Sequence, residues 1–332
     1  MDENTKKRIL TGDRPTGRLH LGHYVDPLRT SAELQDAYDE IIEVADVQAL
    51  TTHFEKPELI KQSILDVTID NLSVGLDPDK VTIFQQSQIP SIAELTIFYS
   101  MIVSCNQLRH NPTIKTEAKN YGYTDLSYGF LGYPVSQTAD ITFCNAHLVP
   151  VGEDQLPHIE LARKIVRKFN ALYGTSIVEP EAKVSSTGRL SGLDGNAKMG
   201  KSLGNALYLS DTPEEIWNKV KVAVTDPAKI HLHDPGHPEV CNVYKYHCVF
   251  NKEEAPGISE QCKKGELGCV ACKKRLNAVL NNLLDPMRER RAYYEQHPDE
   301  VKDILAKGNK RCNEIGNQNL AEIKEKMHIL VK

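Results

Sequence analysis

The sequence predicts an α/β fold, in which a parallel sheet covered by helices is followed by a mostly helical second domain. Two observations predict this class. Short apolar runs alternate with helical patterns in the first half, and strand signals fade after residue 212 while helical patterns continue. The length of 332 residues suits about two domains, and 40% hydrophobic residues suffice for a sizeable core.

Three apolar runs of the first half are expected to form parallel strands, at residues 8–11, 41–45 and 81–84. Helices are expected to begin near Leu21, to run from Pro57 to Gly75 and to cover residues 91–104. In a sheet of this kind, the ligand site lies at the carboxyl ends of the strands.

The second half begins with a segment of different composition. Residues 187–202 are rich in Gly, Ser, Asn and Lys and have no periodicity, which indicates a long mobile loop. Helical patterns then dominate, notably at residues 270–294 and 299–331. We therefore expect a first domain of residues 1–205, which the C-terminal helix could complete, and a second domain of residues 206–332.

The charge balance and the apolar runs limit the function classes. There are 40 Lys and Arg against 45 Asp and Glu, so the net charge is −5 and no global basic field exists. A local patch could still bind nucleic acid. No apolar run reaches the ~18 residues of a membrane span, and the charged start has no apolar segment behind it. We expect a cytoplasmic protein without a membrane partner.

The segment His20-Leu21-Gly22-His23 stands at a predicted strand-to-helix turn. Gly22 permits close backbone approach, and the two imidazoles are expected to share one face of the first helical turn. Helix amides and imidazoles together suit phosphoryl oxygens. Composition alone predicts roughly 0.03 occurrences of such a string in this chain.

A second candidate motif, Lys198-Met199-Gly200-Lys201-Ser202, lies in the predicted loop. Two lysines three apart on a flexible segment can close over a polyphosphate and neutralise the charge of a leaving group. The alternative is a solvated lysine-rich loop.

The eight cysteines are unevenly distributed, and five lie between residues 241 and 272. Cys241, Cys262, Cys269 and Cys272 have the spacing C-x20-C-x6-C-x2-C, which fits tetrahedral Zn²⁺ or a 4Fe–4S cluster. Cys248 is a spare that could replace Cys241. The remaining cysteines, Cys105, Cys144 and Cys312, are expected to be buried thiols.

Together, the two phosphate-binding motifs resemble the HIGH and KMSKS elements of class I aminoacyl-tRNA synthetases. The segments 15–20, 133–135, 139–141 and 149–155 are similar to those of the tryptophanyl branch, and the similarity covers nearly the whole chain. The resemblance implies a Rossmann catalytic domain, a helical anticodon-binding domain and a homodimer. The resemblance further implies ATP and L-tryptophan as substrates, Mg²⁺ as the cofactor that accompanies ATP, and tRNA(Trp) as the macromolecular partner.

The resemblance also assigns residues. His20, His23, Lys198 and Lys201 would be catalytic, and Asp140 would accept the indole N–H, which agrees with the chemistry of a ring that offers one donor. The alternative for Asp140 is a helix cap or a buried ion pair. The implied ATP-binding residues are Arg14, Pro15, Thr16, Gly22, His23, Gly152, Glu153, Asp154, Leu190, Lys198, Met199, Gly200, Lys201 and Ser202. Gly12, Gln48, Gln137 and Asp140 would bind the amino acid.

Three departures from the family pattern concern the loop and the amino-acid pocket. Gly200 replaces the usual Ser, Gln48 stands where many members have His, and Gln137 stands three residues before Asp140, as in tyrosyl enzymes. Tyrosine specificity is therefore the nearest alternative. A non-catalytic paralogue that binds tryptophan or adenylate, and a small adenylyltransferase, are the other two.

A subset of tryptophanyl enzymes carries a four-cysteine iron–sulfur cluster, and the segments 238–241 and 268–274 resemble that subset. The resemblance favours a 4Fe–4S cluster over Zn²⁺ at Cys241, Cys262, Cys269 and Cys272. Residues 241–275 hold seven Lys or Arg against four Glu, a local basic island suited to the anticodon stem or loop. A solvated charged face is the alternative for this island.

Overall fold

A computed structural model describes residues 6–184, 190–196, 199–200 and 203–331. In this part of the chain a five-stranded sheet has the order β3-β2-β1-β4-β5, and all its paired strands are parallel. The strands are β1 (Arg8–Asp13), β2 (Asp39–Val44), β3 (Val81–Gln85), β4 (Leu148–Val151) and β5 (Glu181–Val184). The three strands expected from the sequence and the α/β class are confirmed.

The register of the central strands aligns their carboxyl ends. Asp13 at the end of β1 pairs with Val44 at the end of β2, and Val44 pairs with Gln85 at the end of β3. Side chains that follow these three strands therefore meet at one edge of the sheet, where a parallel α/β fold binds its ligands.

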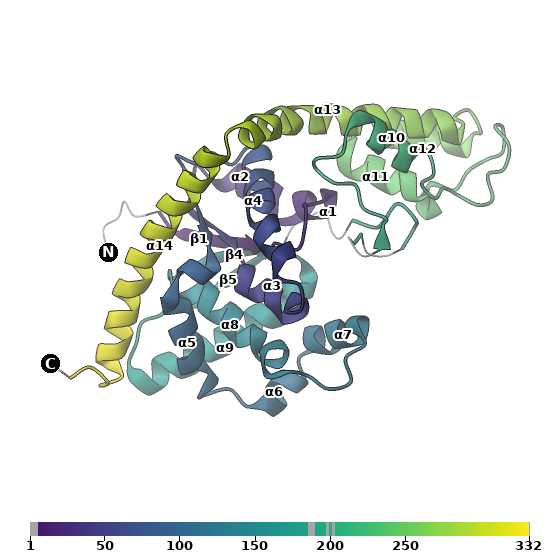
Figure 1. The fold of residues 1–332 in the computed structure, drawn as a ribbon. Helices are drawn as coiled ribbons and strands as arrows, with labels where there is room; N and C mark the ends of the chain where they lie inside the picture. Colours follow the sequence, from purple (N-terminus) through teal and green to yellow (C-terminus); the bar gives the residue numbers. More distant parts are fainter. Residues whose placement is uncertain (1–5, 185–189, 197–198, 201–202, 332) are drawn as a thin grey trace.

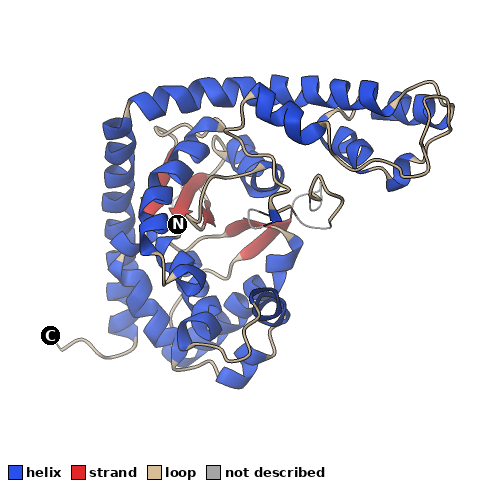
Figure 2. Ribbon diagram, turned by 45° about the vertical axis from the view of Figure 1, so that its right-hand side comes forward, coloured by secondary structure: helices blue, strands red, loops and turns tan. Residues whose placement is uncertain are grey.

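Helices surround this sheet, as Figure 2 shows. Pro57 opens a helix as expected, and the chain leaves it through Gly75, whose φ of +103° lies in the region that favours glycine. The helix expected at residues 91–104 ends at Ser100, because Ser104 caps a separate helix. The elements are α1 (Leu21–His23), a π-helical turn (Tyr24–Leu28), α2 (Arg29–Leu34), α3 (Asp46–His53), α4 (Pro57–Ser73), η2 (Gln86–Gln88), α5 (Pro90–Ser100), α6 (Cys105–Arg109), α7 (Pro112–Tyr121), α8 (Tyr128–Thr142), η3 (Glu153–Gln155) and α9 (Leu156–Tyr173).

The second half is helical, as expected, and it extends away from the sheet before its last helix returns to it (Figure 1). Its elements are α10 (Pro213–Val220), η5 (Pro238–Val240), α11 (Asn242–Phe250), α12 (Ala255–Lys263), α13 (Cys269–Gln296) and α14 (Pro298–Lys326). None of the described helices is both long and apolar enough to cross a membrane.

The C-terminal helix α14 packs directly on β3. A Cβ atom at Gly308 would lie 1.8 Å from the carbonyl oxygen of Ile83, so the two backbones touch at this point. Two turns later, a Cβ atom at Gly316 would lie 2.3 Å from Ser91 Oγ of α5. Leu305 and Leu320 of α14 belong to the two hydrophobic clusters that also contain the sheet residues Ile42 and Ile41. The last helix is thus part of the sheet's packing.

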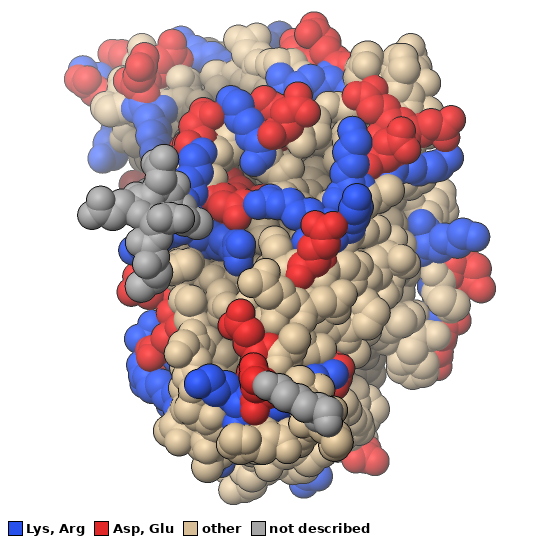
Figure 3. All heavy atoms as spheres, turned by 90° about the vertical axis from the view of Figure 1, so that its left-hand side faces the viewer, with Lys and Arg blue, Asp and Glu red and all other residues tan. Residues whose placement is uncertain are grey.

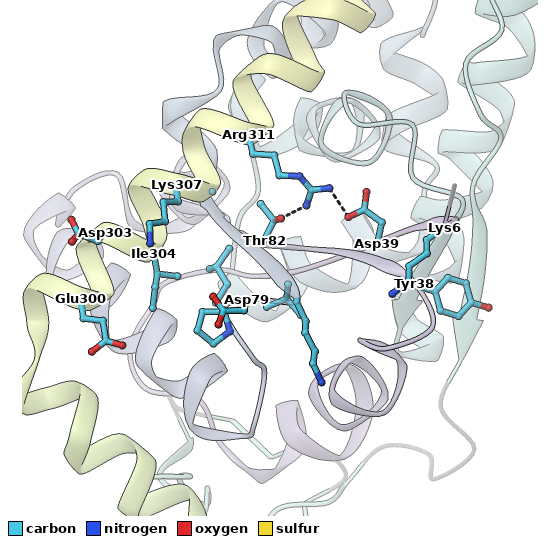
Figure 4. A pocket seen from close by; sticks show the side chains of 15 residues that line it. Lys6, Tyr38, Asp39, Asp79, Thr82, Glu300, Asp303, Ile304, Lys307 and Arg311 are labelled. Atoms are coloured by element: carbon cyan, nitrogen blue, oxygen red, sulfur yellow. Dashed lines mark hydrogen bonds and ion pairs between the residues drawn. The ribbon is translucent and has the colours of Figure 1, made fainter. Parts of the chain in front are cut away.

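A polar groove of about 1020 Å³ lies between α14 and the amino ends of β2 and β3 (Figure 4). Arg311 of α14 reaches across it to Thr82 and to Asp39, with 2.8 Å between Nη2 and Asp39 Oδ1. Acidic and basic side chains intermingle over the molecular face shown in Figure 3. The groove lies at the opposite edge of the sheet from the carboxyl ends, and it lines no part of the expected site.

One buried acid on β2 makes stability depend on pH. Glu40 is fully buried, neither of its carboxyl oxygens has a hydrogen-bond partner among the described residues, and Ser31 faces it without an aligned bond. Burial raises the pKa of Glu40 from 4.5 to about 7. The folded protein therefore binds this proton more tightly than the unfolded chain does. The resulting contribution to the free energy of unfolding is fully present below pH 4.5 and is lost as the pH rises to about 7.

A Glu40→Gln variant is accordingly expected to be more stable than the parent protein by about 3 kcal/mol at pH 8 and by little at pH 5. Urea unfolding at the two pH values measures the difference. Glu322→Gln, which changes an exposed carboxylate of α14, is the control and should behave alike at both. A gain for Glu40→Gln that is equal at pH 5 and pH 8 would contradict the titration argument.

Candidate active site

The turn after β1 carries the two histidines. His20 caps α1: its Nδ1 accepts from the backbone N–H of Gly22 at 3.1 Å, and its own N–H donates to His23 Nδ1 at 3.1 Å. The ring centroids are 3.9 Å apart. The expectation that both rings share one face of the first helical turn was wrong in detail, because His20 precedes the helix and folds over its first turn.

This capping arrangement fixes the protonation of both rings. In each neutral imidazole one nitrogen accepts and the other carries the proton. Because Nδ1 is the acceptor in His20 and in His23, the proton of each neutral ring is on Nε2. An N–H donor on Nε2 is what a phosphoryl oxygen requires.

The loop motif comes close to this turn through its methionine. Met199 is buried in the same hydrophobic cluster as Leu19 and Leu21, and its sulfur lies 3.9 Å from the position of a Cβ at Gly22. The Met199 N–H points to the carbonyl of Leu190 at 3.4 Å, which places Leu190 there too. Lys198, Lys201 and Ser202 lie outside the described residues.

Gly200 is not required by the packing. Among the residues that the structure describes, a Cβ atom there would meet only Leu203, at 3.6 Å, which is an ordinary contact. The backbone N–H of Gly200 donates to Asn205 Oδ1 at 3.0 Å, so the loop is held here by a bond that any residue could make. The departure from Ser in the family pattern thus removes a hydroxyl without changing the space available.

A buried acid occupies the other end of the site. Asp140 of α8 is 3% exposed, and its Oδ1 accepts from Gln86 Nε2 at 2.8 Å. Gln86 follows β3, and its Oε1 accepts from the backbone N–H of Gln48 at 2.9 Å. Burial raises the pKa of Asp140 to about 7. Asp140 is therefore neither a helix cap nor a partner in an ion pair between the described residues.

The other expected residues that the structure describes lie on several elements and differ in how far they are exposed. Gln137 lies one helical turn before Asp140 and is half-buried, and Gly12 is an exposed residue of β1. Gly152 follows β4, the neighbour of β1, whereas Glu153 and Asp154 are exposed in η3. The structure thus places Gly12, Gly152, Glu153, Asp154 and Asp140 at the carboxyl edge of the sheet.

Arg14 joins this edge to three helices. Its guanidinium is 3.8 Å from Glu117 of α7, which accepts from the Tyr133 hydroxyl of α8 at 2.8 Å. The same hydroxyl is 2.8 Å from Nε2 of His158 in α9, and burial lowers the pKa of His158 to about 4. These contacts tie the side chain of Arg14 to α7, α8 and α9. Pro15 and Thr16, the other expected residues of the turn, follow it directly in the sequence.

The histidine turn is also tied to the helical half. Fully buried Asp70 of α4 accepts from the backbone N–H of Leu19 at 2.7 Å through Oδ2. Its Oδ1 accepts from Arg291 of α13, which also reaches Asp66 and Glu295. One carboxylate therefore links the residue before His20 to α13.

The four cysteines with metal-ligand spacing line a single small cavity. Cys241 precedes α11, Cys262 lies near the end of α12, and Cys269 and Cys272 form the first turn of α13. Cys248 does not line this cavity. Cys144 and Cys312 are buried as expected, but Cys105 is exposed because it begins the short surface helix α6.

The electrostatics of this cavity oppose free thiolates. Burial, followed by the negative charges of the other three cysteines, raises the pKa of Cys272 to about 12. Burial also raises the pKa of Cys262, although Lys229 acts against it. Among the described residues, no three His, Cys, Asp or Glu side chains are grouped so that they could hold a single metal ion.

Two residues that make contacts in the site, Gln86 and Glu43, are not among those expected from the sequence. Gln86 directly follows β3 and lies two residues beyond the strand predicted at residues 81–84, which is a usable signal. Glu43 is an acid inside the apolar run of β2, and such a residue is a signal for a buried polar contact.

Comparison with known proteins agrees with this geometry. Residues 2–285 match the family model described as tRNA synthetases class I (W and Y). The tryptophan–tRNA ligases of Streptococcus mutans and Lactococcus lactis are each 48% identical over 336 residues, which covers 98% of this chain and 99% and 98% of theirs. The crystal structure of Campylobacter jejuni tryptophanyl-tRNA synthetase complexed with ADP and tryptophan superposes with a TM-score of 0.85 at 29% identity, covering 97% of this chain and 99% of that one.

The family match covers more than half of the chain, and the two relatives extend over nearly all of it. The parallel sheet, the histidine turn and the buried acid at its carboxyl edge agree with that assignment. The chain therefore belongs to the family of class I tRNA synthetases for tryptophan and tyrosine.

Proposed function

We propose that the protein ligates L-tryptophan to tRNA(Trp) through a tryptophanyl adenylate, releasing AMP and pyrophosphate from ATP. The observation that carries this proposal is Asp140, a buried carboxyl group at the same sheet edge as the histidine turn. Indole offers one N–H donor and no acceptor, and a carboxylate in an otherwise apolar site is a strong acceptor for it. The relatives of similar length support tryptophan as the amino acid.

In the first step, the tryptophan carboxylate attacks the α-phosphorus of ATP and pyrophosphate leaves. His20 and His23 donate from Nε2 to phosphoryl oxygens, and Lys198 and Lys201 neutralise the charge that develops on pyrophosphate. Mg²⁺, when bound, would supply further charge neutralisation at the phosphates. The terminal ribose hydroxyl of tRNA then attacks the adenylate. Catalysis is by positioning and electrostatics, without a covalent enzyme nucleophile.

Amino-acid-dependent exchange of pyrophosphate into ATP tests the proposal. Exchange that depends on tryptophan, with tyrosine inactive, is the expected result, because a site built around one polar contact rejects the wrong side chain strongly. Exchange with tyrosine alone would establish the tyrosyl alternative, for which Gln137 one turn before Asp140 is the supporting feature. Binding of tryptophan without exchange would establish a non-catalytic paralogue.

We further propose that Cys241, Cys262, Cys269 and Cys272 hold a 4Fe–4S cluster. The four residues line one cavity, and a positively charged centre would relieve the mutual repulsion of their thiolates. Around a single zinc ion with bonds of ~2.3 Å, the sulfurs would be about 3.8 Å apart. In a cluster each cysteine would bind a different iron, so wider spacing between the sulfurs is tolerated than around one zinc ion.

Anaerobically purified protein is therefore expected to be coloured and to contain about four iron atoms and about four sulfide ions per chain. A double variant with Cys269→Ser and Cys272→Ser should lose the colour, the order of α11 and α12, and tRNA charging, while ATP binding persists. Cys248→Ser is the matched control and should keep all of them. One zinc per chain in colourless protein would favour the alternative, and full charging by the double variant would remove the site from function.

The remaining expectations are proposals about assembly. We propose a homodimer, which is supported by three large exposed apolar side chains: Ile97 of α5, Met101 just after α5, and Tyr128 at the start of α8. We also propose that residues 1–205 with α14 form the catalytic unit and that the rest of residues 206–332 contacts tRNA through the basic island of residues 241–275. The packing of Gly308 of α14 on β3 supports this division.

A further inference from the structure

An acid in the middle of β2 lies under the amino-acid end of the site. Glu43 is 4% exposed and pairs across the sheet with Gly12 of β1 and with Phe84 of β3. A Cβ atom at Gly12 would lie 2.8 Å from Glu43 Cβ and 3.2 Å from its Oε2. Because Gly12 is exposed and has no side chain, Glu43 is covered here by backbone alone.

Glu43 contacts the acid that is proposed to hold the indole. Its side chain forms a hydrogen bond with the Asp140 side chain, while Gln86 donates to Asp140 Oδ1 at 2.8 Å. Its other oxygen, Oε1, has no partner among the described residues. Two carboxyl groups can share a hydrogen bond only when one of them keeps its proton.

The surroundings decide which acid keeps it. The charged groups that act on Glu43 are Asp140 of α8 and Asp46 at the start of α3, and both are acidic. The nearby thiols of Cys144, after α8, and Cys312, on α14, are buried, which raises the pKa of each. Burial raises the pKa of both acids, and the two neighbouring acids raise that of Glu43 further, well above its ordinary value, whereas the bonds from Gln86 and Glu43 oppose the rise at Asp140. Asp140 already accepts an N–H from Gln86, while Glu43 Oε1 has no donor among the described residues, so the negative charge is better satisfied on Asp140. Glu43 is therefore the proton donor.

We propose that Glu43 is a positioning residue of the amino-acid site, which in its protonated form donates to the Asp140 carboxylate and holds it ionised and oriented toward the indole N–H. This inference rests on the proposed role of Asp140 in tryptophan binding. With Gln86 and Glu43 both donating to it, Asp140 is left with acceptor positions only. Such a site accepts the single donor of indole.

The role has a consequence for pH. Asp140 must be ionised to accept strongly, and its pKa is about 7, so tryptophan binding weakens as the pH falls below that value. A variant without the donor at position 43 loses a bond that favours the ionised form. Its loss of tryptophan binding therefore begins at a higher pH than in the parent protein.

The test compares Glu43→Leu with Glu43→Gln in tryptophan-dependent pyrophosphate exchange between pH 6 and pH 9. Glu43→Leu removes the donor, and KM for tryptophan is expected to rise by about 10-fold or more, with the acid limb of kcat/KM shifted to higher pH. Glu43→Gln keeps an N–H donor and should stay within about threefold of the parent protein. KM for ATP should be unchanged in both.

Thermal unfolding of both variants separates folding from positioning. If Glu43→Leu does not fold, the pH profile of Glu43→Gln decides, and a profile like that of the parent protein supports the donor role. An unchanged tryptophan KM in Glu43→Leu, or an equal loss in both variants, overturns the inference. Absence of tryptophan-dependent exchange in the parent protein would instead overturn the proposed function.

Discussion

An Asp140→Ala variant is expected to show a KM for tryptophan at least about 100-fold above that of the parent protein, with KM for ATP within about threefold. The substitution removes the proposed acceptor of the indole N–H and leaves Gln86 and Glu43, the two side chains bonded to it, buried without that partner. The nucleotide residues lie on other elements, so they keep their contacts. Steady-state pyrophosphate exchange, with either substrate varied, measures both constants.

The control for this substitution is Asp125→Ala, which removes an exposed carboxylate shortly before α8 and should leave both constants unchanged. Asp140→Asn is informative as a graded change, because the amide keeps an acceptor oxygen without the charge, and an intermediate tryptophan KM is expected. A tryptophan KM that stays near the parent value in Asp140→Ala would remove Asp140 from the amino-acid site.

The second large effect concerns stability. A Gly308→Ala variant is expected to lose about 3 kcal/mol or more of unfolding free energy, because its Cβ would lie 1.8 Å from the Ile83 carbonyl oxygen. Both overlapping groups belong to regular elements, so α14 must move away from β3 to relieve the clash. Urea unfolding, followed by circular dichroism, measures the loss.

Gly257→Ala is the matched control for a glycine in a helix. Gly257 lies in α12 and is exposed, and among the described residues a Cβ placed there meets nothing within 4 Å apart from its chain neighbours and the nearby backbone of its own helix. Alanine is favoured over glycine in a helix by about 1 kcal/mol, so this variant should be slightly more stable than the parent protein. Equal stability of Gly308→Ala and the parent protein would mean that α14 does not pack on β3 as described.

The parts of this fold that could be predicted from the sequence are those with local causes. Alternating apolar runs predicted β1, β2 and β3, and Pro57 and Gly75 marked the ends of α4 because each acts on its own backbone. Cys241, Cys262, Cys269 and Cys272, which are clustered in the sequence, line one cavity in the structure, while the metal predicted for them stays a prediction.

The parts that could not be predicted depend on contacts between distant residues. The bond between Gln86 and Asp140 joins residues 54 positions apart, and the pairing of Glu43 with Asp140 joins residues that are still farther apart in the sequence. Neither pair has a sequence pattern, since only the register of β2 and the packing of α8 bring them together. The cap formed by His20 was mispredicted for another reason, because spacing alone does not tell a cap residue from a first-turn residue.

The carboxylate of Asp70 has a mechanical consequence. It holds the Leu19 backbone with one oxygen and Arg291 of α13 with the other, and it is fully buried. Losing Arg291 would leave the buried charge of Asp70 without its ion-pair partner, which costs several kcal/mol, so this contact resists breaking. A displacement of α13, such as a macromolecule bound at its far end would cause, would therefore be transmitted through Asp70 to the backbone that carries His20.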